Sequence, residues 1–349
     1  MKQTIGDVAK EAGVSIATVS RVINGNYPVK ESTRQKVQKV IDEMQFEPNV
    51  LARGLINRKS DTIGVIVPSI TNLFFPSVVK AIEKTLRSEG YHIYLCDTDA
   101  DPAKELSYMR SLASRQVDGI IIIDPTIDNM KNGYFEEMNK KLPLVSINGY
   151  SNNIDCNFVL NDEEMGTTQA MHYLFSLGHQ NIAFMRGKNS YSYDIKEKIY
   201  TQMMEEHNLQ ANINIINIGE GNTEHTVNEA MTKAEQFFMQ ESNTTAIFTC
   251  NDIMALGAIN ACRRIGKLIP DEVSVIGFDN IELSVLIEPK LTTVDQNMHE
   301  LGTVAAKMLL DILEEKTRIK TDIVTHPETR KVVVTSTLIE RDSCQKVSP

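Results

Sequence analysis

The first sixty positions show apolar residues at helical spacing in three short stretches, which predicts three helices followed by a linker. The first stretch begins at Thr4, whose side chain can cap a helix together with Asp7, three residues further on. Gly13 supplies a sharp turn, Ser15 is a second candidate cap, and Ser32 opens the third stretch. The predicted apolar faces are Ile5, Val8, Ala9 and Ala12, then Val19, Val22 and Ile23, then Val37, Val40, Ile41 and Met44.

From residue 62 the pattern changes to short apolar runs that alternate with amphipathic helices, which is typical of parallel sheets covered on both faces. We expect helices over about 75–89, closed by Gly90, from about Asp101 onward, and over 297–316. Nine or so strands exceed one open sheet, so we predict two doubly wound lobes that divide near residue 161. The predicted strands are 62–67, 91–97, 118–124, 142–148, 156–162, 181–187, 213–219, 245–252 and 273–279.

Charge divides the chain into a basic end and an acidic body. The whole chain carries a formal net charge of −10, yet residues 1–60 hold ten Lys and Arg against six Asp and Glu, a net charge of +4. The remainder therefore carries −14. This asymmetry points to nucleic acid at the basic end, although +4 over sixty residues decides nothing alone.

Several function classes find no support in the sequence. The 349 residues, 42% apolar and 23% charged, are those of an ordinary globular protein of two or three domains. No apolar run reaches the roughly 18 residues of a membrane span, and the N-terminus lacks the apolar stretch of an export signal. Five cysteines without a CxxC pair favour a reducing cytoplasm. Catalytic and nucleotide-binding motifs are missing, so we expect no enzyme, no metal and no cofactor.

Residues 15–24 combine an apolar inward face with an outward polar face, as a DNA-recognition helix requires. Arg21 can make a bidentate contact with guanine, and Ile16 and Ala17 can touch thymine methyl groups. Ser15 and Ser20 also face outward. Because any small three-helix domain shows similar stripes, the pattern alone leaves DNA binding open.

Longer motifs in this chain resemble those of one known protein family. Residues 4–26, TIGDVAKEAGVSIATVSRVINGN, resemble the signature of the LacI/GalR family of bacterial repressors, and residues 29–55 are similar to that family's third helix and hinge. The resemblance covers nearly the whole chain in order, and it implies an operator-binding dimer with a periplasmic-binding-protein-like core for a small effector. It continues through TIGVIVPSITNLFF (62–75), VDGIIII (117–123), LGHQNIAF (177–184), NDIMALGAINA (251–261), IPDEVSVIGFDN (269–280) and KLTTVDQNMHELG (290–302).

The resemblance also implies roles at the DNA-binding end. Ile16 and Ala17 match positions that discriminate between operators, and Arg21 matches a base-reading arginine. Residues 49–56 match a hinge helix that folds only on operator DNA, in which Leu55 enters the minor groove. A plain flexible linker is the alternative. The predicted DNA-binding set is Thr4, Ser15, Ile16, Ala17, Thr18, Ser20, Arg21, Asn24, Asn49, Ala52, Arg53 and Leu55.

The predicted architecture is thus an N-terminal all-α helix-turn-helix domain and a two-lobed α/β core with two doubly wound parallel sheets. By resemblance, three chain crossings join the lobes, and residues 331–340 return as a strand to the second lobe. The predicted boundaries are 1–47 for the helix-turn-helix domain, 48–60 for the hinge helix and linker, 61–161 with 293–320 for the N-terminal lobe, 162–292 with 321–340 for the C-terminal lobe, and 341–349 for a frayed tail.

Two facing lobes of this kind enclose a crevice at the C-terminal ends of their strands, where effectors bind. By position the candidates are Ser69, Asp124, Asp162, Asn251 and Asp279, with Asp252 beside them. Asp and Asn at strand-to-helix turns also cap the following helix very often, so for each of them capping stays open, above all for Asp252.

The resemblance adds two residues and some departures. Phe75 matches an aromatic ligand contact, and Lys196 stands where the family usually has an arginine. Ile199 replaces a usual glycine and Leu73 a usual proline. A lysine offers one mobile point charge, which suits an anionic effector. The predicted effector-binding set is Ser69, Phe75, Asp124, Asp162, Lys196, Asn251 and Asp279.

These observations predict a cytoplasmic, homodimeric repressor of carbohydrate-related genes, controlled by a sugar, sugar acid or sugar phosphate. A carbon-catabolite regulator with a phosphoprotein corepressor is one alternative, because Ile16, Ala17 and ARGL (52–55) resemble that branch. Lys307, however, stands where that branch carries an arginine. A periplasmic-type ligand carrier is the alternative from another class, but it explains residues 61–340 and leaves 1–60 unexplained.

Overall fold

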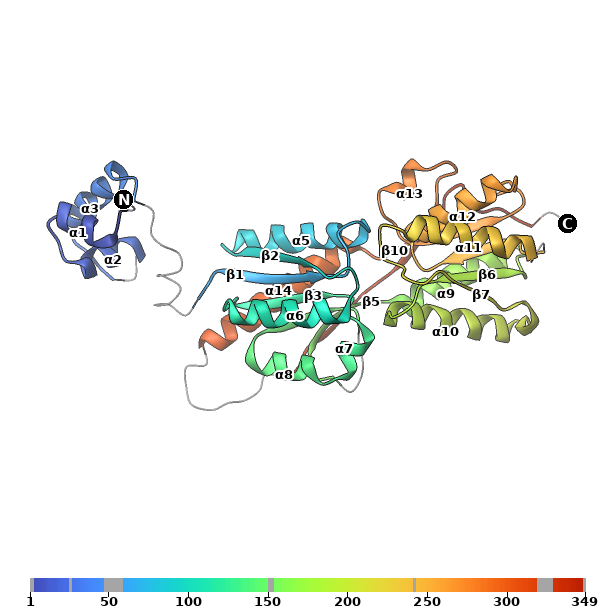
Figure 1. The fold of residues 1–349 in the computed structure, drawn as a ribbon, viewed down its shortest axis with the longest axis horizontal. Coiled ribbons are helices and arrows are strands. Elements are labelled where there is room, and N and C mark those ends of the chain that lie inside the picture. The colour runs from blue at the N-terminus through green and yellow to red at the C-terminus, as the bar shows by residue number, and fades with distance from the viewer. Residues whose placement is uncertain are drawn as a thin grey trace. The chain divides into compact units, whose positions relative to one another are not determined.

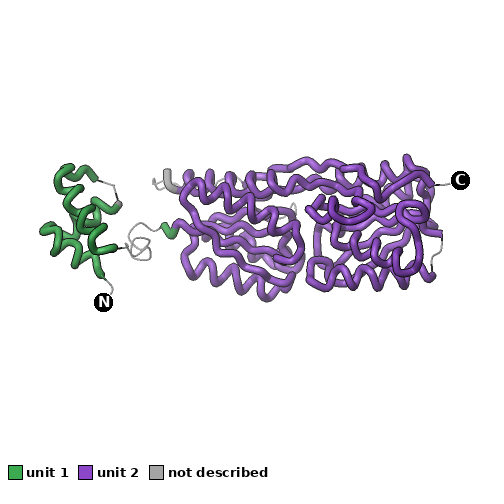
Figure 2. Tube along the Cα trace, turned by 90° about the horizontal axis from the view of Figure 1, so that it is seen from above, with its two compact units in different colours: residues 1–60 green, residues 61–349 purple. Residues whose placement is uncertain are grey.

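The chain folds into two compact units, residues 1–60 and residues 61–349 (Figure 2). The computed structural model describes residues 3–24, 27–46, 59–149, 154–240, 243–318 and 329–347. Among these residues, every helix is too short or too polar to cross a membrane.

Three short helices form the first unit, as predicted. Thr4 caps the first helix: its hydroxyl accepts the Asp7 N–H at 3.3 Å, and its own N–H donates to the Asp7 carboxylate at 2.8 Å. Gly13 turns the chain with a φ of +60°, and the Ser15 hydroxyl accepts the Thr18 N–H at 3.2 Å. The helices are α1 (Ile5–Glu11), α2 (Ile16–Asn24) and α3 (Glu31–Glu43).

The third helix begins at Glu31, before the expected Ser32. Lys30, not Ser32, occupies its N-cap position and makes no side-chain capping bond there. The three apolar stripes meet in one small core, which fixes the orientation of α2 and leaves its other face open. This core consists of Val8, Ala9, Ala12, Val19, Val22, Val37, Val40 and Phe46.

Two six-stranded sheets form the second unit (Figure 1). In order across the first sheet, the strands are β11 (Lys331–Val334), β5 (Asn157–Asn161), β4 (Leu144–Ile147), β3 (Gly119–Ile123), β1 (Thr62–Val67) and β2 (His92–Asp97). In order across the second sheet, they are β12 (Thr337–Ile339), β10 (Thr292–Asp295), β9 (Ser274–Asp279), β8 (Ala246–Thr249), β6 (Ile182–Arg186) and β7 (Asn214–Asn217). All pairs are parallel except β10 with β12. Apart from β11 and β12, both sheets share one winding order, so the prediction of two doubly wound lobes is confirmed.

Helices cover both faces of each sheet, which explains why the strands are apolar throughout. On the first sheet, α5 and α14 pack together on one face and α6 covers the other; on the second sheet, α9 pairs with α10 and α11 with α12 (Figure 1). The helices of the first lobe are α5 (Phe74–Ser88), α6 (Pro102–Ser114), α7 (Ile127–Lys131), α8 (Tyr134–Lys141) and α14 (Met298–Arg318). Those of the second are α9 (Glu163–Ser176), α10 (Tyr191–Glu206), α11 (Thr226–Gln240), α12 (Asp252–Arg264) and α13 (Leu283–Leu286), with a 3-10 turn over Gln210–Asn212.

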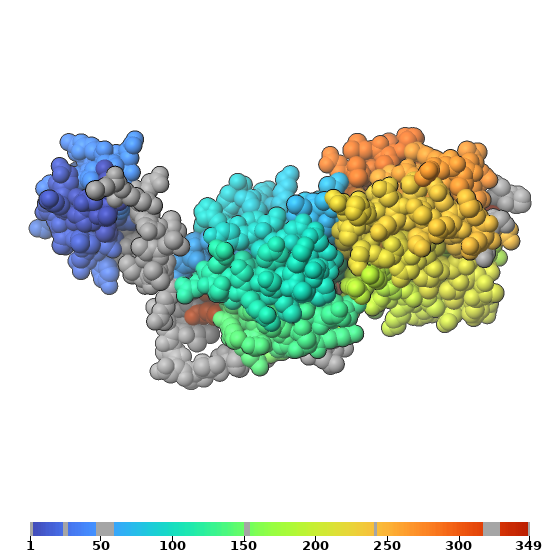
Figure 3. All heavy atoms as spheres, viewed as in Figure 1, coloured from blue at the N-terminus to red at the C-terminus, as the bar shows by residue number. Residues whose placement is uncertain are grey.

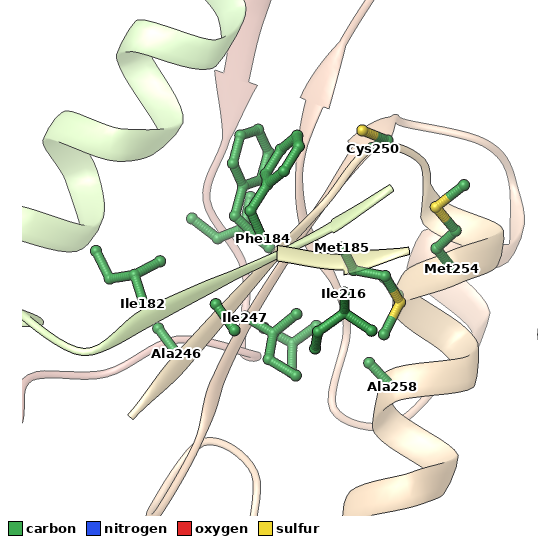
Figure 4. Close-up of a cluster of buried hydrophobic side chains, with 14 of the residues drawn as sticks. Ile182, Phe184, Met185, Ile216, Ala246, Ile247, Cys250, Met254 and Ala258 are labelled. Carbon is green, nitrogen blue, oxygen red and sulfur yellow. The ribbon is translucent and has the colours of Figure 1, made fainter. Parts of the chain in front are cut away.

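The second lobe has one continuous apolar core around its sheet. Phe184 of β6 stacks on Tyr200 with ring centroids 5.0 Å apart, whereas Met185 points to the opposite face. Figure 4 shows Met185 and Ile216 lying toward Ala258 of α12. Alternate side chains of β6 thus pack against the helices on opposite faces of the sheet. The ends of the strands in this sheet carry part of the candidate site.

Close packing of α11 against α12 depends on Gly257. A Cβ at this position would lie 2.5 Å from the Ala230 Cβ and 2.6 Å from the Val227 carbonyl oxygen. Gly257→Ala is therefore expected to lower the free energy of unfolding by about 1–3 kcal/mol, because the helices must separate to admit the methyl group. Denaturant unfolding measures this loss. The exposed Lys233→Ala on α11 should stay within about 0.5 kcal/mol of wild type, and equal stability of both variants would refute the packing argument.

Two lobe boundaries differ from the predicted ones. Residues 292–295 form β10 and belong to the second sheet, and residues 331–334 form β11 and belong to the first. The apolar run over 331–340 is therefore not one strand of the second lobe: it divides between β11 and β12, and Ser336 lies at the crossing. A continuous apolar pattern carries no local signal for a change of sheet.

The expected frayed tail is also wrong over the residues that are described. The Ser343 carbonyl accepts the Val275 N–H at 2.8 Å, and the Ser343 hydroxyl donates to the Val275 carbonyl at 2.6 Å. The Val347 N–H donates to the Leu177 carbonyl at 2.9 Å. These bonds attach residues 341–347 to the second lobe, because they satisfy backbone groups beside β9.

Candidate functional site

The outward face of α2 is the first candidate surface. Ser15, Ala17 and Arg21 are exposed, and Ile16 is 54% exposed although it is a large apolar residue. The Arg21 guanidinium carbon lies 5.4 Å from the ring centre of Tyr27. An apolar side chain and an arginine on one open helix face match the groups that read thymine methyls and guanine in a major groove.

The other predicted DNA contacts divide into two groups. Thr4 and Thr18 take part in helix capping, and Thr18 and Ser20 are half-buried, so the side chains of the latter two are less open than those of Ile16 and Arg21. The remaining predictions fall outside the described residues; they are the side chain of Asn24 and the hinge residues Asn49, Ala52, Arg53 and Leu55.

The second candidate site lies where the strand ends of the two lobes meet. In each sheet the winding reverses between two central strands, β1 and β3 in the first and β6 and β8 in the second, and doubly wound sheets bind ligands at such points. Ser69 and Asp124 follow β1 and β3, and Asn251 follows β8. The sequence therefore located these residues at the correct edges.

Direct bonds hold the two lobes together at this place. Asn72 Nδ2 donates to Asn222 Oδ1 at 3.0 Å, and Ser190 Oγ donates to Asp124 Oδ1 at 3.3 Å. The cavity that remains has a volume of about 20 Å³, room for roughly one water molecule. The atoms of the two lobes accordingly adjoin on the face seen in Figure 3. The cavity is lined by Pro68, Ala100, Asp124, Thr126, Lys188, Asn189, Ser190, Glu220, Gly221 and Asn222.

Asn222 is the centre of this contact, and no sequence pattern had pointed to it. Its Oδ1 also accepts from the Tyr193 hydroxyl at 3.2 Å and from Asn251 Nδ2 at 3.5 Å. Gly221 makes room for this arrangement, because a Cβ there would lie 2.4 Å from the Tyr193 hydroxyl. Asn222 sits in the loop after β7, at no strand end of the switch point, so position alone could not select it.

Lys196 is buried, with only 1% of its surface exposed. Its Nζ donates to Ser192 Oγ at 2.9 Å and to the Cys250 carbonyl at 3.1 Å, and it lies 3.7 Å from the ring centre of Phe278. Glu163 Oε1 is 3.9 Å away. The ammonium thus has neutral acceptors, an aromatic face and a carboxylate around it within its own lobe.

Carboxyls lie around this lysine; Glu163 and Asp279 are buried and Asp124 is half-buried. Burial and the nearby Glu163 raise the pKa of Asp124 to about 7, and burial raises the pKa of Glu163. Burial likewise raises the pKa of Asp279, and the neighbouring Asp252 adds to this shift while Lys196 opposes it. Asp279 also has a φ of +119°, a conformation that L residues rarely adopt. Such strain is typical of positions held by their surroundings at binding sites.

Other predicted effector residues have structural partners. Asp162 Oδ1 accepts the Met165 N–H at 3.0 Å as the cap of α9, and Asn251 Oδ1 accepts the Met254 N–H at 2.8 Å as the cap of α12. Phe75 is buried in the first-lobe core with its ring centroid 5.2 Å from that of Phe74. Ser69 Oγ bonds to Thr71 Oγ1 at 2.8 Å.

Asp252, for which capping stayed open, fastens its lobe internally: its Oδ2 accepts the Ile281 N–H at 2.9 Å, and Oδ1 accepts from the Thr293 hydroxyl. Across the described ranges, the structure contains no cluster of three His, Cys, Asp or Glu side chains that could hold a metal ion.

Comparison with known proteins places these two sites in a family. Residues 4–49 match the model described as bacterial regulatory proteins, lacI family, and residues 171–344 match the periplasmic binding protein-like domain. Catabolite control protein A of Priestia megaterium is 36% identical over 320 residues, which are 91% of this chain and 94% of that protein.

Two solved structures share this fold. A lac repressor dimer bound to operator and the anti-inducer ONPF superposes with a TM-score of 0.84 at 25% identity, and the match covers 99% of this chain and all of that one. A lacI-family regulator of Enterococcus faecium with bound ribose superposes with a TM-score of 0.70 at 26% identity, over 82% of this chain and all of that one. The alternative of a ligand carrier does not explain why residues 4–49 match the model of lacI-family regulatory proteins. The chain therefore belongs to the lacI family of bacterial regulatory proteins, and it is a DNA-binding transcriptional regulator, not an enzyme.

Proposed function

We propose that this regulator acts in the cytoplasm as a homodimeric repressor of carbohydrate-related genes, controlled by a small effector in the crevice between its lobes. The open face of α2, which joins exposed Ile16 to Arg21, is the observation that carries the operator-binding part. A lac repressor dimer is bound to operator in a solved structure of similar fold, and this supports the dimer. Two copies would then read two symmetric half-sites.

The effector part rests on the switch-point position of the crevice. Asp124 lines the cavity, and Asn251 donates to Asn222, which also lines it. Lys196 acts electrostatically on Asp279 and opposes the rise of its pKa. Ribose bound to the Enterococcus faecium relative supports a carbohydrate. An effector would bias lobe closure, because it must break or replace the Asn72–Asn222 bond, and closure would change the spacing of the DNA-binding domains.

Arg21→Ala tests the operator-binding part. The expected result is a loss of about 5- to 150-fold in affinity for the specific operator, because a bidentate arginine–guanine contact is worth about 1–3 kcal/mol. Fluorescence anisotropy on a fragment selected from genomic DNA measures the loss at fixed salt. Lys39→Ala removes the same charge from the exposed side of α3 and should weaken binding far less. If wild type prefers no sequence, the proposal fails.

A second candidate is a carbon-catabolite regulator with a phosphoprotein corepressor. Similarity to catabolite control protein A favours it, and so does a surface hollow of about 430 Å³ lined by Lys80, Lys84 and His299 beside the start of α14. Asp295 also lines this hollow, which weakens its attraction for phosphate. Operator binding that requires a seryl-phosphorylated partner, and that is lost in Lys84→Glu, would favour this second function.

A further inference from the structure

We propose that the interlobe crevice takes a cationic effector, a ligand that carries a protonated amine, and excludes sugar acids and sugar phosphates. This inference rests on the proposed function of the crevice as an effector site and specifies the charge of its ligand. It departs from the expectation that Lys196 would attract an anion.

The first argument is the balance of buried charge. Glu163 of the second lobe acts electrostatically on Asp124 of the first lobe and on Asp279 of its own lobe. Lys196 is the ammonium that acts on all three. Further out, Arg341 acts on Asp252 and offsets its charge, while Glu105 acts on Asp124 and adds one more carboxyl. Burial raises the pKa of all three carboxyls, so they tend to hold protons unless a cation compensates them; were all three to ionise, they would exceed Lys196 by two negative charges.

The other cations near the strand ends are already paired. Arg186, at the end of β6, makes ion pairs with Asp194 and Glu197 of α10. Lys188 lies 2.9 Å from Glu220 at the rim of the cavity. Neither of these side chains therefore offsets the surplus of negative charge inside.

The second argument is that Lys196 is not available to a ligand anion. Its ammonium already donates to Ser192 and to the Cys250 carbonyl, and it covers the face of Phe278. To meet an anion, it would have to leave these partners while almost wholly buried. Position in the sequence suggested a free cation, but its surroundings make it an internal counterion.

The third argument is the supply of unused acceptors. Within the described residues, Glu163 Oε1 and Gln296 Oε1 are buried and have no hydrogen-bond donor, and the Gln296 amide already donates to Asp279. Neither residue lines the cavity, so a ligand donor reaches these acceptors only when the lobes open. A protonated amine offers three donors and no acceptor, whereas a carboxylate or phosphate offers only further acceptors. Hydroxyl groups could fill the rest of the site, so an amino sugar satisfies both the charge and the bonds.

Proton affinity agrees with this geometry. Burial and the nearby carboxylates raise the pKa of Asp124 to about 7, so an entering cation would favour the ionised form. Affinity for an amine should then increase as pH rises through 7, since less work is needed to deprotonate Asp124. Affinity for an anion should change in the opposite direction.

The test uses the full chain and probes of equal size but different charge. Calorimetric titrations compare glucosamine with glucose and glucuronate, galactosamine with galactose and galacturonate, and putrescine with butanediol and succinate, at pH 6 and pH 8. At least one amine should bind ten or more times more tightly than its neutral and anionic partners at pH 6. Putrescine, whose amines stay protonated throughout, should bind more tightly at pH 8, whereas the amino sugars lose protons near that pH. Asp124→Asn should reduce that preference at least tenfold, whereas Asp128→Asn, exposed on α7, should retain it.

Outcomes separate this inference from the proposed function. If a neutral or anionic probe binds as tightly as its amine partner and alters operator binding, the inference is overturned while the effector crevice stands. If no probe of any charge binds, although operator binding is intact, both the cationic ligand and the effector crevice are rejected. Glu163→Gln provides a second variant in case Asp124→Asn fails to fold, and it should weaken the same preference.

Discussion

Replacement of Lys196 by methionine is expected to lower the free energy of unfolding of the core by about 3–5 kcal/mol, the usual result of removing one partner from a buried charge cluster. Methionine fills similar space but leaves Glu163 without its counterion and removes the donor to the Cys250 carbonyl. For a unit of this size the melting temperature should fall by roughly 5–15 °C. Thermal unfolding of the full chain, followed by calorimetry, measures it.

Two further variants test the cause of that loss. Lys188→Met removes an exposed lysine that is paired with Glu220 in the same lobe, and it should change stability by less than about 1 kcal/mol. The double variant Lys196→Met with Glu163→Gln should recover a large part of the loss, because it removes the stranded carboxylate as well. A loss below about 1 kcal/mol in Lys196→Met would mean that the carboxyls simply take up protons and need no counterion.

Strand patterns predicted the lobes because both sheets are covered on both faces. Ile120 to Ile123 of β3 are all buried, and so are the residues of β8 and β9, which makes these runs conspicuous in the sequence. The strands β10 and β12 are short, and β12 is only partly buried, so they gave no comparable signal. Nor could the pattern find the change of sheet at Ser336, since the Ser336 hydroxyl bonds to Asn161, far away in the sequence.

In the crevice, too, the sequence predicted residues placed by local structure but not pairs of residues that are distant in the sequence. Strand ends selected Asp124, which lines the cavity, because the end of a parallel strand has a fixed place in the fold. Asn72 and Asn222 meet only through lobe closure, across 150 positions of sequence, and no spacing rule could pair them. The sequence shows that both asparagines are present, but it does not show that they lie within hydrogen-bond distance of each other.

Lys196 is the instructive intermediate case. Its bond to Ser192, one helical turn earlier, is a local feature that the sequence displays. Its other partners, Glu163 and Phe278, come from distant elements. The local sequence therefore predicted a positive charge at Lys196, but it could not show that Glu163 and Phe278 of this same chain lie against that charge.

Raising the pH from 5 to 8 is expected to destabilise the core by on the order of 3 kcal/mol. Burial raises the pKa of both Glu105 and Asp124 to about 7, so these carboxyls hold protons in the folded state that the unfolded chain has lost. This contribution is complete below about pH 4 and is lost as pH rises through about 7. His179 opposes it, because burial lowers its pKa and costs stability when the unfolded chain takes up a proton at low pH. The single histidine is outweighed by these two carboxyls and by the raised pKa values of Glu163, Asp252 and Asp279. Chemical unfolding at a series of pH values measures the net slope.

Asp124→Asn isolates one contribution from this sum. Asparagine can still accept the Ser190 hydroxyl through its Oδ1 but never ionises, so the variant escapes the loss that wild type suffers above neutrality. Relative to wild type, its stability should improve by about 1–2 kcal/mol between pH 5 and pH 8, a value reduced for the partial exposure of this carboxyl. His179 is common to both proteins and cancels from the comparison. Asp128→Asn is the control: it measures how the free energy of unfolding changes when an exposed carboxylate of the same lobe is removed. A difference between wild type and Asp124→Asn that stays constant with pH would show that Asp124 is ionised throughout, with Lys196 as its effective counterion.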